Sequence, residues 1–477
     1  MKLNTKILHI AKNFSYTLSS QSVSFVITTL VILVVPKLVG VEQYGYWQLY
    51  LFYTAYIGFL HFGWNDGIYL KYGGAEYQQL DKKIFYSQFL QLLALQLFIG
   101  IVIYLTSLYL VKDVNRLFIL KMTALCLVIV NTRYFLLFTL QATNRFKEFA
   151  LITFLDRGVY ALLIVVCLVF GVRDFRLLVI TDIIGKLLGL GIAIYFCSDI
   201  VLRKIKDFSW TIKEAVNNVA VGINLMFAAI ASKLLIGTVR LGIERHWEIS
   251  VFGKVSLVLS ISNMLMLFIN AVGLVIYPVL RRSKEENLSN IYVTMRDFLM
   301  VILLGMLVIY YPAKETLTFW LPNYADSLQY MALLFPITVY EGKMALLINT
   351  YLKTLRKEKL MLKINLIALL MSVVSTATLI FVLQNLNWVV VSITFLLAFR
   401  CILAELLLSR ILKIKLHKDI VLELLMTTIF VLSGWFINSW IVVLVYSAGF
   451  LLYLVVKQND IRHMVVRVKQ LVKVKDV

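Results

Sequence analysis

Long apolar runs alternate with short polar segments along nearly the whole chain. Each run lasts about 20 residues or more, which is the length of a helix that crosses a hydrocarbon layer of about 30 Å. A strand of a membrane β-barrel would instead show about ten residues of alternating polarity. The pattern therefore predicts fourteen membrane-spanning helices. Their approximate bounds are 14–38, 44–70, 84–110, 117–140, 149–171, 175–197, 216–239, 250–279, 298–320, 328–352, 360–384, 388–409, 419–438 and 440–456.

The composition agrees with helices that face lipid. Of the 477 residues, 61% are hydrophobic and 15% are charged, and the mean hydropathy is +0.86. Such a chain has too little polar surface for a soluble globular protein, whereas in a bilayer each helix pairs its own backbone groups. We therefore expect an all-α polytopic membrane protein. No signal peptide with a cleavage site is present, so the first apolar run is expected to remain as a span.

Lysine and arginine are distributed unevenly between the two sets of loops. With the N-terminus in the cytoplasm, the inward segments carry 30 basic residues and the outward loops carry 8. Basic residues favour the cytoplasmic side, so both termini are predicted to be cytoplasmic. The net charge of +21 is thus spread over short loops that face anionic lipids. This distribution argues against nucleic-acid binding, which requires a basic face on a soluble domain.

The sequence carries no motif for metal binding or catalysis. The four cysteines and five histidines are scattered, and the CxxC, HExxH, GxSxG and Walker A patterns do not occur. No loop exceeds about twenty residues, which leaves no room for an external catalytic domain. We expect a protein that is not an enzyme and that needs no metal or cofactor.

The two halves of the chain share a local pattern. The segment QYGYWQLYL at 43–51 aligns with VFGKVSLVL at 251–259, an offset of 208. Lys147 and Glu148 align with Lys357 and Glu358 at an offset of 210. Two places with nearly the same offset indicate duplication of a six-helix unit. Since six is even, both copies would have the same orientation, related by an axis along the membrane normal.

The duplication predicts how the chain is organised. We expect an N-lobe at 1–198, a cytoplasmic linker at 199–215 and a C-lobe at 216–412. Two further helices and a basic cytoplasmic tail would occupy 413–477.

Three segments resemble a known family of transporters. They are PKLVGVEQYGYWQLY at 36–50, GFLHFGWNDGIYLKYGG at 58–74 and LQATNRFKEFALI at 140–152. Their order and spacing are similar to those of the polysaccharide flippases in the multidrug/oligosaccharidyl-lipid/polysaccharide exporter superfamily. The resemblance implies two six-helix bundles in a V, with a central cavity that opens alternately to each side.

The resemblance also implies a substrate and a location. The substrate would be an undecaprenyl-pyrophosphate-linked oligosaccharide, a repeat unit for O-antigen, capsule or exopolysaccharide synthesis. The protein would move it from the inner to the outer leaflet of the bacterial cytoplasmic (inner) membrane. Partners would be membrane lipids, a polysaccharide polymerase and glycosyltransferases.

Charged side chains inside the apolar spans bear on this expectation, because each costs at least about 2.5–3.5 kcal/mol at the centre of a bilayer. Six basic residues are predicted to lie deep in the membrane: Arg133, Arg157, Lys186, Lys233, Lys343 and Arg400. The deep acids are predicted to be Asp156, Asp182, Glu341 and Glu405, with Asp66 nearer the cytoplasmic end of its span.

Two interpretations of these charges remain open. In the first, they pair with one another: Asp182 and Lys186 are four residues apart on one helix, and Asp156 lies on the helix after Arg133. In the second, the cations face a cavity. Even with every acid paired, one positive charge is left over in each half, which would suit a pyrophosphate because arginine and lysine bind phosphate oxygens.

Other polar residues give weaker signals. Gln21, Asn224, Asn263 and Asn270 are candidate sugar contacts, with interhelical packing as the alternative. Since no nucleotide-binding loop is present, energy would come from an ion gradient, the membrane potential or consumption of the lipid on the far side. Coupling to Na⁺ or H⁺ would use acids such as Asp66, Asp156 and Glu341.

Two other functions are alternatives to the flippase. A drug or cation antiporter of the same superfamily would be expected to place a carboxylate in its cavity, often on the first helix, and span one has none. A membrane polymerase or ligase would need a larger outward loop than the segment of about ten residues at 240–249.

Overall fold

Helices are the only regular secondary structure in the part of the chain that the computed structural model describes, which is residues 26–282, 285–437 and 439–463. Within these residues, ten helical segments are long and apolar enough to cross a membrane, and three shorter apolar helices accompany them. An interrupted pair, α2 (Val41–Ile57) and α3 (Trp64–Lys71), completes the fourteen predicted spans. The predicted class, an all-α polytopic membrane protein, is therefore confirmed.

The chain forms two compact units, Met1–Ile230 and Ala231–Val477, and the division falls inside one long helix, α9 (Ile212–His246). Besides α2, α3 and the first part of α9, the first unit contains helix Val26–Val39, α4 (Lys82–Leu110), α5 (Val114–Ala142), α6 (Phe146–Val169), α7 (Phe175–Phe196) and α8 (Ser198–Val201), with short 3₁₀ turns at Tyr77–Gln79 and Ile205–Asp207.

The second unit holds the rest of α9 and the helices that follow it. These are α10 (Ile249–Arg282), α11 (Glu285–Met306), α12 (Tyr310–Trp320), α13 (Ala325–Leu328), α14 (Met331–Leu334), α15 (Ile337–Lys343), α16 (Asn349–Thr354), α17 (Glu358–Thr378), α18 (Leu386–Leu412), α19 (His417–Phe436) and α20 (Ile441–Val456). Short 3₁₀ turns cover Leu307–Ile309 and Pro322–Tyr324, and π-helical turns cover Met344–Ile348 and Leu379–Leu383.

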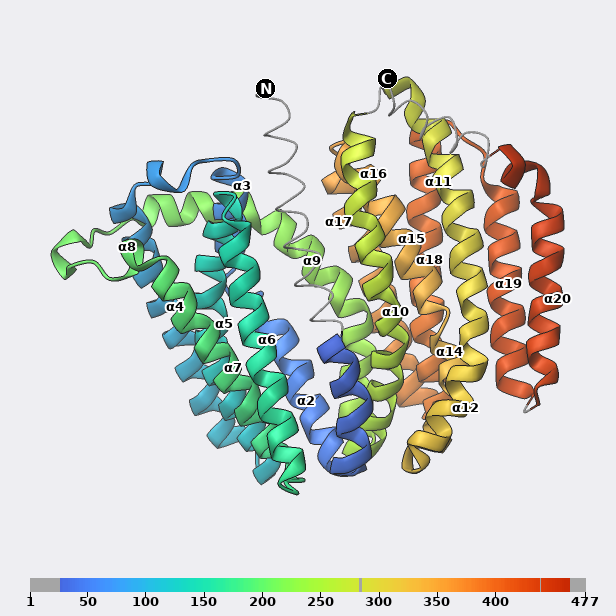
Figure 1. The fold of residues 1–477 in the computed structure, drawn as a ribbon, viewed down its shortest axis with the longest axis horizontal. Helices are drawn as coiled ribbons and strands as arrows, with labels where there is room; N and C mark the ends of the chain where they lie inside the picture. The colour runs from blue at the N-terminus through green and yellow to red at the C-terminus, as the bar shows by residue number, and fades with distance from the viewer. Residues whose placement is uncertain (1–25, 283–284, 438, 464–477) are drawn as a thin grey trace. The chain divides into compact units, whose positions relative to one another are not determined.

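The fourth span of each half forms the centre of its unit. In the first unit, α4 to α7 lie side by side (Figure 1), and α5 packs against α2, α3, α4 and α7. Of the apolar window of α5, 78% is buried, against 22% for α4. In the second unit, the broken span Met331–Thr354 is 89% buried and packs against α10, α11 and α18. A span enclosed by protein can carry charged and amide side chains that lipid would exclude.

Two backbone details recur in the two halves of the chain. Asp174 caps α7 by accepting from the Arg176 N–H at 2.8 Å, and Asn385 caps α18 by accepting from the Asn387 N–H at 2.9 Å. The turns after the central spans also match. The Arg145 N–H bonds the Leu140 carbonyl and the Lys357 N–H bonds the Leu352 carbonyl, both at 2.8 Å. These turns are 212 positions apart, so the predicted pairing of Lys147 with Lys357 is displaced by two residues.

The second span differs from its prediction as one helix over 44–70. The helix stops at Ile57 and restarts at Trp64, with positive φ angles at Phe62 (54°) and Gly63 (81°) between them. Buried amides satisfy the backbone carbonyls that the interruption frees. The Asn131 side chain donates to the Ile57 carbonyl at 2.9 Å, and the Gln96 side chain donates to the Leu60 carbonyl at 3.1 Å.

The restart of this span packs closely against α9. A Cβ atom at Gly67 would lie 1.8 Å from the Asn218 carbonyl oxygen, and one at Gly222 would lie 2.0 Å from the Gly63 carbonyl oxygen. Only glycine fits at these positions, because any larger residue would force the two backbones apart. The glycines therefore fix the N-terminal half of α9 against α3.

The segment before α9 is tied to the start of α4 and to the short turn that precedes it. The Tyr77 hydroxyl donates to Asp199 at 2.6 Å, and the Lys82 ammonium lies 3.3 Å from the same carboxylate. Further along, the Ser209 N–H donates to the Ser87 hydroxyl at 3.0 Å. The predicted linker segment is thus held on the first unit by specific hydrogen bonds.

Candidate functional site

Arg133 on α5 and Asp156 on α6 form a buried ion pair. Their residues are 5% and 4% exposed. Two glycines of α7 make room for the pair. A Cβ atom at Gly189 would lie 3.0 Å from the Arg133 guanidinium, and one at Gly185 would lie 2.9 Å from the Asp156 carbonyl oxygen. The interpretation of these charges as a pair is confirmed, and three neighbouring helices meet at it.

A second buried ion pair lies on α7 between Asp182 and Lys186. The two residues are one helical turn apart, as their spacing predicts. The Tyr50 hydroxyl of α2 donates to the Asp182 carboxylate at 2.7 Å, so this pair also joins two helices. A charged pair that is removed from water needs such additional hydrogen bonds to offset its desolvation.

Arg157 follows Asp156 on α6 but has a different environment. Consecutive residues of a helix point in different directions, so the two side chains do not face the same neighbours. The Arg157 side chain is exposed, and no carboxylate of the described residues lies within 4.0 Å of it. Asp156 and Asp182 act on its charge only at longer range. Arg157 is thus an exposed arginine within a span of the first unit that forms no ion pair with a described carboxylate.

Asp66 lies in the first turn of α3, beside the interruption of the second span. Its carboxylate is 3.7 Å from Nε2 of the buried His61, and its side chain is 18% exposed. The Gly63 N–H donates to Nδ1 of His61 at 3.0 Å, which leaves Nε2 to carry the proton of the neutral ring. The predicted coupling acid is therefore next to a titratable partner that was not singled out in the sequence.

In the second unit, Arg400 on α18 pairs with Glu341 on α15. Arg400 also donates to the Ser232 hydroxyl of α9 at 2.7 Å, and its side chain is 2% exposed. Lys233, the next residue on α9, is exposed. The sequence did not indicate which partners Arg400 contacts, because Glu341 and Ser232 come from two other helices.

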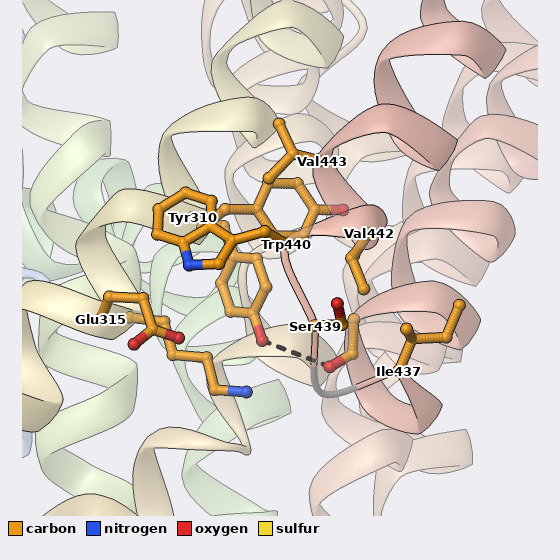
Figure 2. A pocket seen from close by; sticks show the side chains of 10 residues that line it. Tyr310, Glu315, Ile437, Ser439, Trp440, Val442 and Val443 are labelled. Atoms are coloured by element: carbon orange, nitrogen blue, oxygen red, sulfur yellow. Dashed lines mark hydrogen bonds between the residues drawn. The ribbon is translucent and has the colours of Figure 1, made fainter.

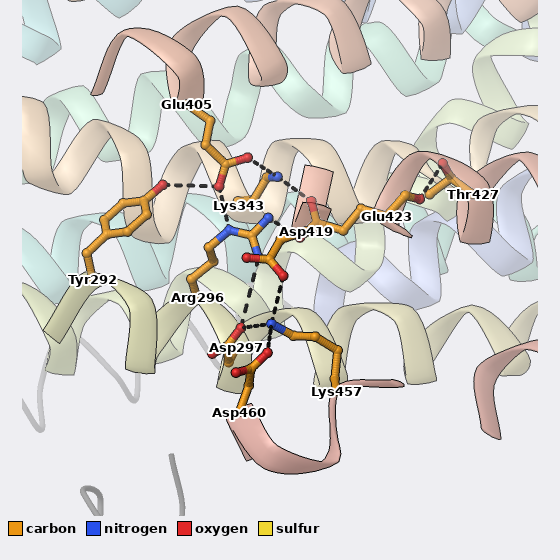
Figure 3. Close-up of polar contacts among 10 residues, drawn as sticks. All are labelled: Tyr292, Arg296, Asp297, Lys343, Glu405, Asp419, Glu423, Thr427, Lys457 and Asp460. Carbon is orange, nitrogen blue, oxygen red and sulfur yellow. Dashed lines mark hydrogen bonds and ion pairs between the residues drawn. The ribbon is translucent and has the colours of Figure 1, made fainter. Parts of the chain in front are cut away.

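Lys343 belongs to a larger buried network, shown in Figure 3. Its ammonium lies 2.6 Å from both Glu405 on α18 and Glu423 on α19. Arg296 on α11 contacts the same two carboxylates at 2.7 and 2.5 Å. The Tyr292 hydroxyl completes the group by donating to Glu405 at 3.2 Å.

The network continues to the end of the last helix. Lys457, which follows α20, lies 2.9 Å from Asp297 and 2.8 Å from both Asp419 and Asp460. These contacts bind α19 and α20 to α11 (Figure 3). Sequence reasoning missed Arg296 and Glu423. Arg296 lies just before the predicted start of its span, and Glu423 lies on the first of the two helices expected after the C-lobe.

The predicted sugar contacts are only partly described. Asn224 and Asn263 are both exposed. Gln21 lies outside the described residues, as does the side chain of Asn270. Within the described part of the chain, no three histidine, cysteine or acidic side chains are grouped so that they would hold a metal ion.

Comparisons with known proteins give a fold but no family. No family model matches the chain, and no curated protein matches it. Among solved structures, an inward-facing multidrug resistance MATE family transporter of the MOP superfamily matches 85% of this chain and 95% of its own length, with a TM-score of 0.61 and 12% identity. The lipid II flippase MurJ in an inward closed conformation matches 94% of this chain and 99% of its own length, with a TM-score of 0.56 and 14% identity.

The chain therefore has the fold of these transporters and flippases, neither of which is an enzyme. The same MATE-type fold recurs in an outward-facing multidrug resistance transporter of the superfamily, with a TM-score of 0.56 and 12% identity.

Proposed function

We propose that the protein is a flippase for undecaprenyl-pyrophosphate-linked oligosaccharides in the bacterial cytoplasmic (inner) membrane, with both termini in the cytoplasm. The observation that carries this proposal is that Arg157 is an exposed residue with no carboxylate within 4.0 Å among the described residues. Pyrophosphate is the anion that the substrate presents, and an arginine fork binds two of its oxygens at once.

The charges around Arg157 support binding of an anion rather than a cation. The four acids that the sequence places deep in the spans each contact a cation, so the first unit keeps a positive charge after its internal pairs are formed. A cationic drug would need a carboxylate that is free to neutralise it, because an unpaired charge in a low-dielectric site is costly. Asp66, beside His61, has no lysine or arginine within 4.0 Å among the described residues, so the drug or cation antiporter, whose fold the chain also shares, stays the alternative function.

The remaining features of the mechanism are proposals of the same kind. Lys233 would add a second positive charge, and the exposed Asn224 and Asn263 would bond sugar hydroxyls. Asp66, beside His61, is the strongest candidate for coupling to Na⁺ or H⁺, because Asp156 and Glu341 already contact arginines. A polysaccharide polymerase and glycosyltransferases would act after and before this step.

The test is transport in proteoliposomes that contain a fluorescent undecaprenyl-pyrophosphate-linked sugar. Arg157→Ala should slow leaflet exchange by about 10–100-fold, because a charge-assisted phosphate contact contributes about 1.5–3 kcal/mol. Arg157→Lys should retain part of the rate. The matched control is Arg173→Ala, an exposed arginine in the turn that follows the same helix, which should exchange the lipid at the wild-type rate.

Two results would contradict the proposal. If Arg157→Ala exchanged the lipid as fast as Arg173→Ala, Arg157 would not bind the substrate. If the wild-type protein exported a cationic dye but did not exchange the lipid, the antiporter would be the correct function. Polymer growth in the same assay would indicate an enzyme.

A further inference from the structure

A cavity of about 250 Å³ lies in the second unit, and none of the charged residues described above lines it (Figure 2). It is enclosed by α12, the C-terminal end of α19 and the start of α20. Its volume is below the range of about 300–1,000 Å³ that is typical of drug-sized ligands. A small group, such as the polar head of a lipid, suits it better than a drug or an oligosaccharide.

Aliphatic, aromatic and charged side chains line the cavity. Figure 2 shows Glu315 on one side and Ile437, Val442 and Val443 on the other. Tyr310 closes the inner end, where its hydroxyl donates to the Gly434 carbonyl at 3.4 Å. Gly434 permits this approach, since a Cβ atom there would lie 3.3 Å from the Tyr310 ring.

The surroundings place the cavity at the edge of the membrane. Phe319 and Trp440 are 89% and 64% exposed, and tryptophan is enriched where the hydrocarbon layer meets water. Leu444, one turn further along α20, is 70% exposed. This end of α20 is opposite the Lys457 end, so the predicted orientation assigns it to the outer leaflet. An acyl chain would thus find an apolar helix surface directly beside the cavity.

Two side chains of opposite charge line the cavity. Lys314 and Glu315 are consecutive on α12, and both line the cavity. Neither side chain makes a hydrogen bond or an ion pair within 4.0 Å with any other residue that the structure describes; the Lys314 backbone carbonyl accepts from the Thr318 hydroxyl at 2.8 Å. An ammonium and a carboxylate side by side complement a ligand that carries a phosphate and an amine in the same small group.

We propose that this cavity binds the head group of a zwitterionic phospholipid of the outer leaflet, phosphatidylethanolamine, with its phosphate on Lys314 and its ammonium on Glu315. An anionic lipid would satisfy Lys314 but would be repelled by Glu315. A soluble phosphoethanolamine carries the same charges but cannot use the apolar surface that continues along α20, so the acyl chains should add to the affinity.

The test measures lipid binding to the full chain in detergent by native mass spectrometry. Phosphatidylethanolamine should bind more tightly than phosphatidylglycerol, and soluble phosphoethanolamine should not bind at matched concentration. Lys314→Ala and Glu315→Gln should each weaken phosphatidylethanolamine binding about tenfold, the effect of losing one charge-assisted contact. Lys112→Ala removes an exposed lysine from a predicted outward turn of the other unit and should leave binding unchanged.

A charge reversal at position 315 tests whether Glu315 determines which lipid is preferred. Glu315→Lys places two cations at the cavity, so it should invert the preference and favour phosphatidylglycerol. Val443→Trp should reduce binding of both lipids by filling the space. Equal binding of the two lipids by wild type, or no change in preference with Glu315→Lys, would overturn the proposal. Tight binding of soluble phosphoethanolamine would show that the ligand is a free phosphoester and not a lipid.

Discussion

Arg133 and Arg157 lie on neighbouring helices of the same unit but have opposite roles in the charge balance. Arg133 is buried against Asp156, whereas Arg157 is exposed and lacks a carboxylate within 4.0 Å in the described chain. The sequence shows both as arginines inside apolar runs, and composition alone cannot separate them. What separates them is the direction in which each helix face points, and packing with α7 determines that direction.

The pairing of deep charges was predictable only where sequence spacing limits the choices. Asp182 and Lys186 are four residues apart on one helix, so their contact follows from helical geometry. For Glu405, the sequence of the second half offers several basic residues as possible partners. Its partners, Arg296 and Lys343, come from two other helices, and this selection depends on tertiary packing.

Removing Arg296 should strongly destabilise the second unit. Arg296→Met would leave Glu405 and Glu423 with Lys343 as their remaining basic partner in the network (Figure 3). Breaking a buried ion pair from one side typically costs about 3–5 kcal/mol, because the remaining charge stays buried without compensation. The free energy of unfolding in mixed micelles would measure the loss.

Arg203→Gln is the matched control for this change. It removes the partly exposed Arg203–Asp207 pair, whose side chains are 27% and 29% exposed. Pairs of this kind contribute about 0–1 kcal/mol. Equal destabilisation by Arg296→Met and Arg203→Gln would contradict a stabilising role for the buried network.

At the scale of elements, the length and apolar character of the spans predicted the helices well, but their interruptions were not predicted. The second span reads as one apolar run, yet it breaks at 58–63 because glycines and buried amides allow it. The span at 328–352 likewise contains several short helical segments. Interruptions depend on polar groups supplied by other helices, which a local pattern does not contain.

The α3–α9 crossing gives a prediction at this scale. Gly67→Ala should destabilise the first unit by about 1–3 kcal/mol or more, because the added methyl group overlaps the Asn218 carbonyl and the backbones must separate. Gly158→Ala is the control, since a Cβ atom there meets nothing within 4 Å. Thermal unfolding in detergent would compare the two, and equal midpoints would show that the crossing is loose.

For the molecule as a whole, acid should release the segment before α9 from the first unit. Asp199 is partly buried, which opposes its ionisation, but the Tyr77 hydroxyl and the Lys82 ammonium hold the pKa of Asp199 below its usual value. A lowered pKa contributes stability above the usual value of about 3.9, and that stability is lost as the pH falls through the lower folded value.

Tyr77→Phe tests this dependence. Loss of the hydroxyl should raise the pKa of Asp199, so the segment at 199–211 should detach at a higher pH than in wild type. Hydrogen exchange of that segment over the acid range would follow the release. Tyr109→Phe, at an 87% exposed position on α4, is the control. Identical pH profiles for Tyr77→Phe and wild type would show that Asp199 does not hold the segment.

The contact between α3 and α9 has a consequence for biosynthesis. Gly222 is made 155 residues after Gly67, so the surface of α3 that it covers has no partner while the intervening chain is synthesised. At about 5–20 residues per second, this interval is roughly 8–30 s. A newly inserted α3 must therefore stay in the membrane with its glycine face uncovered. During this interval, membrane proteases have access to α3.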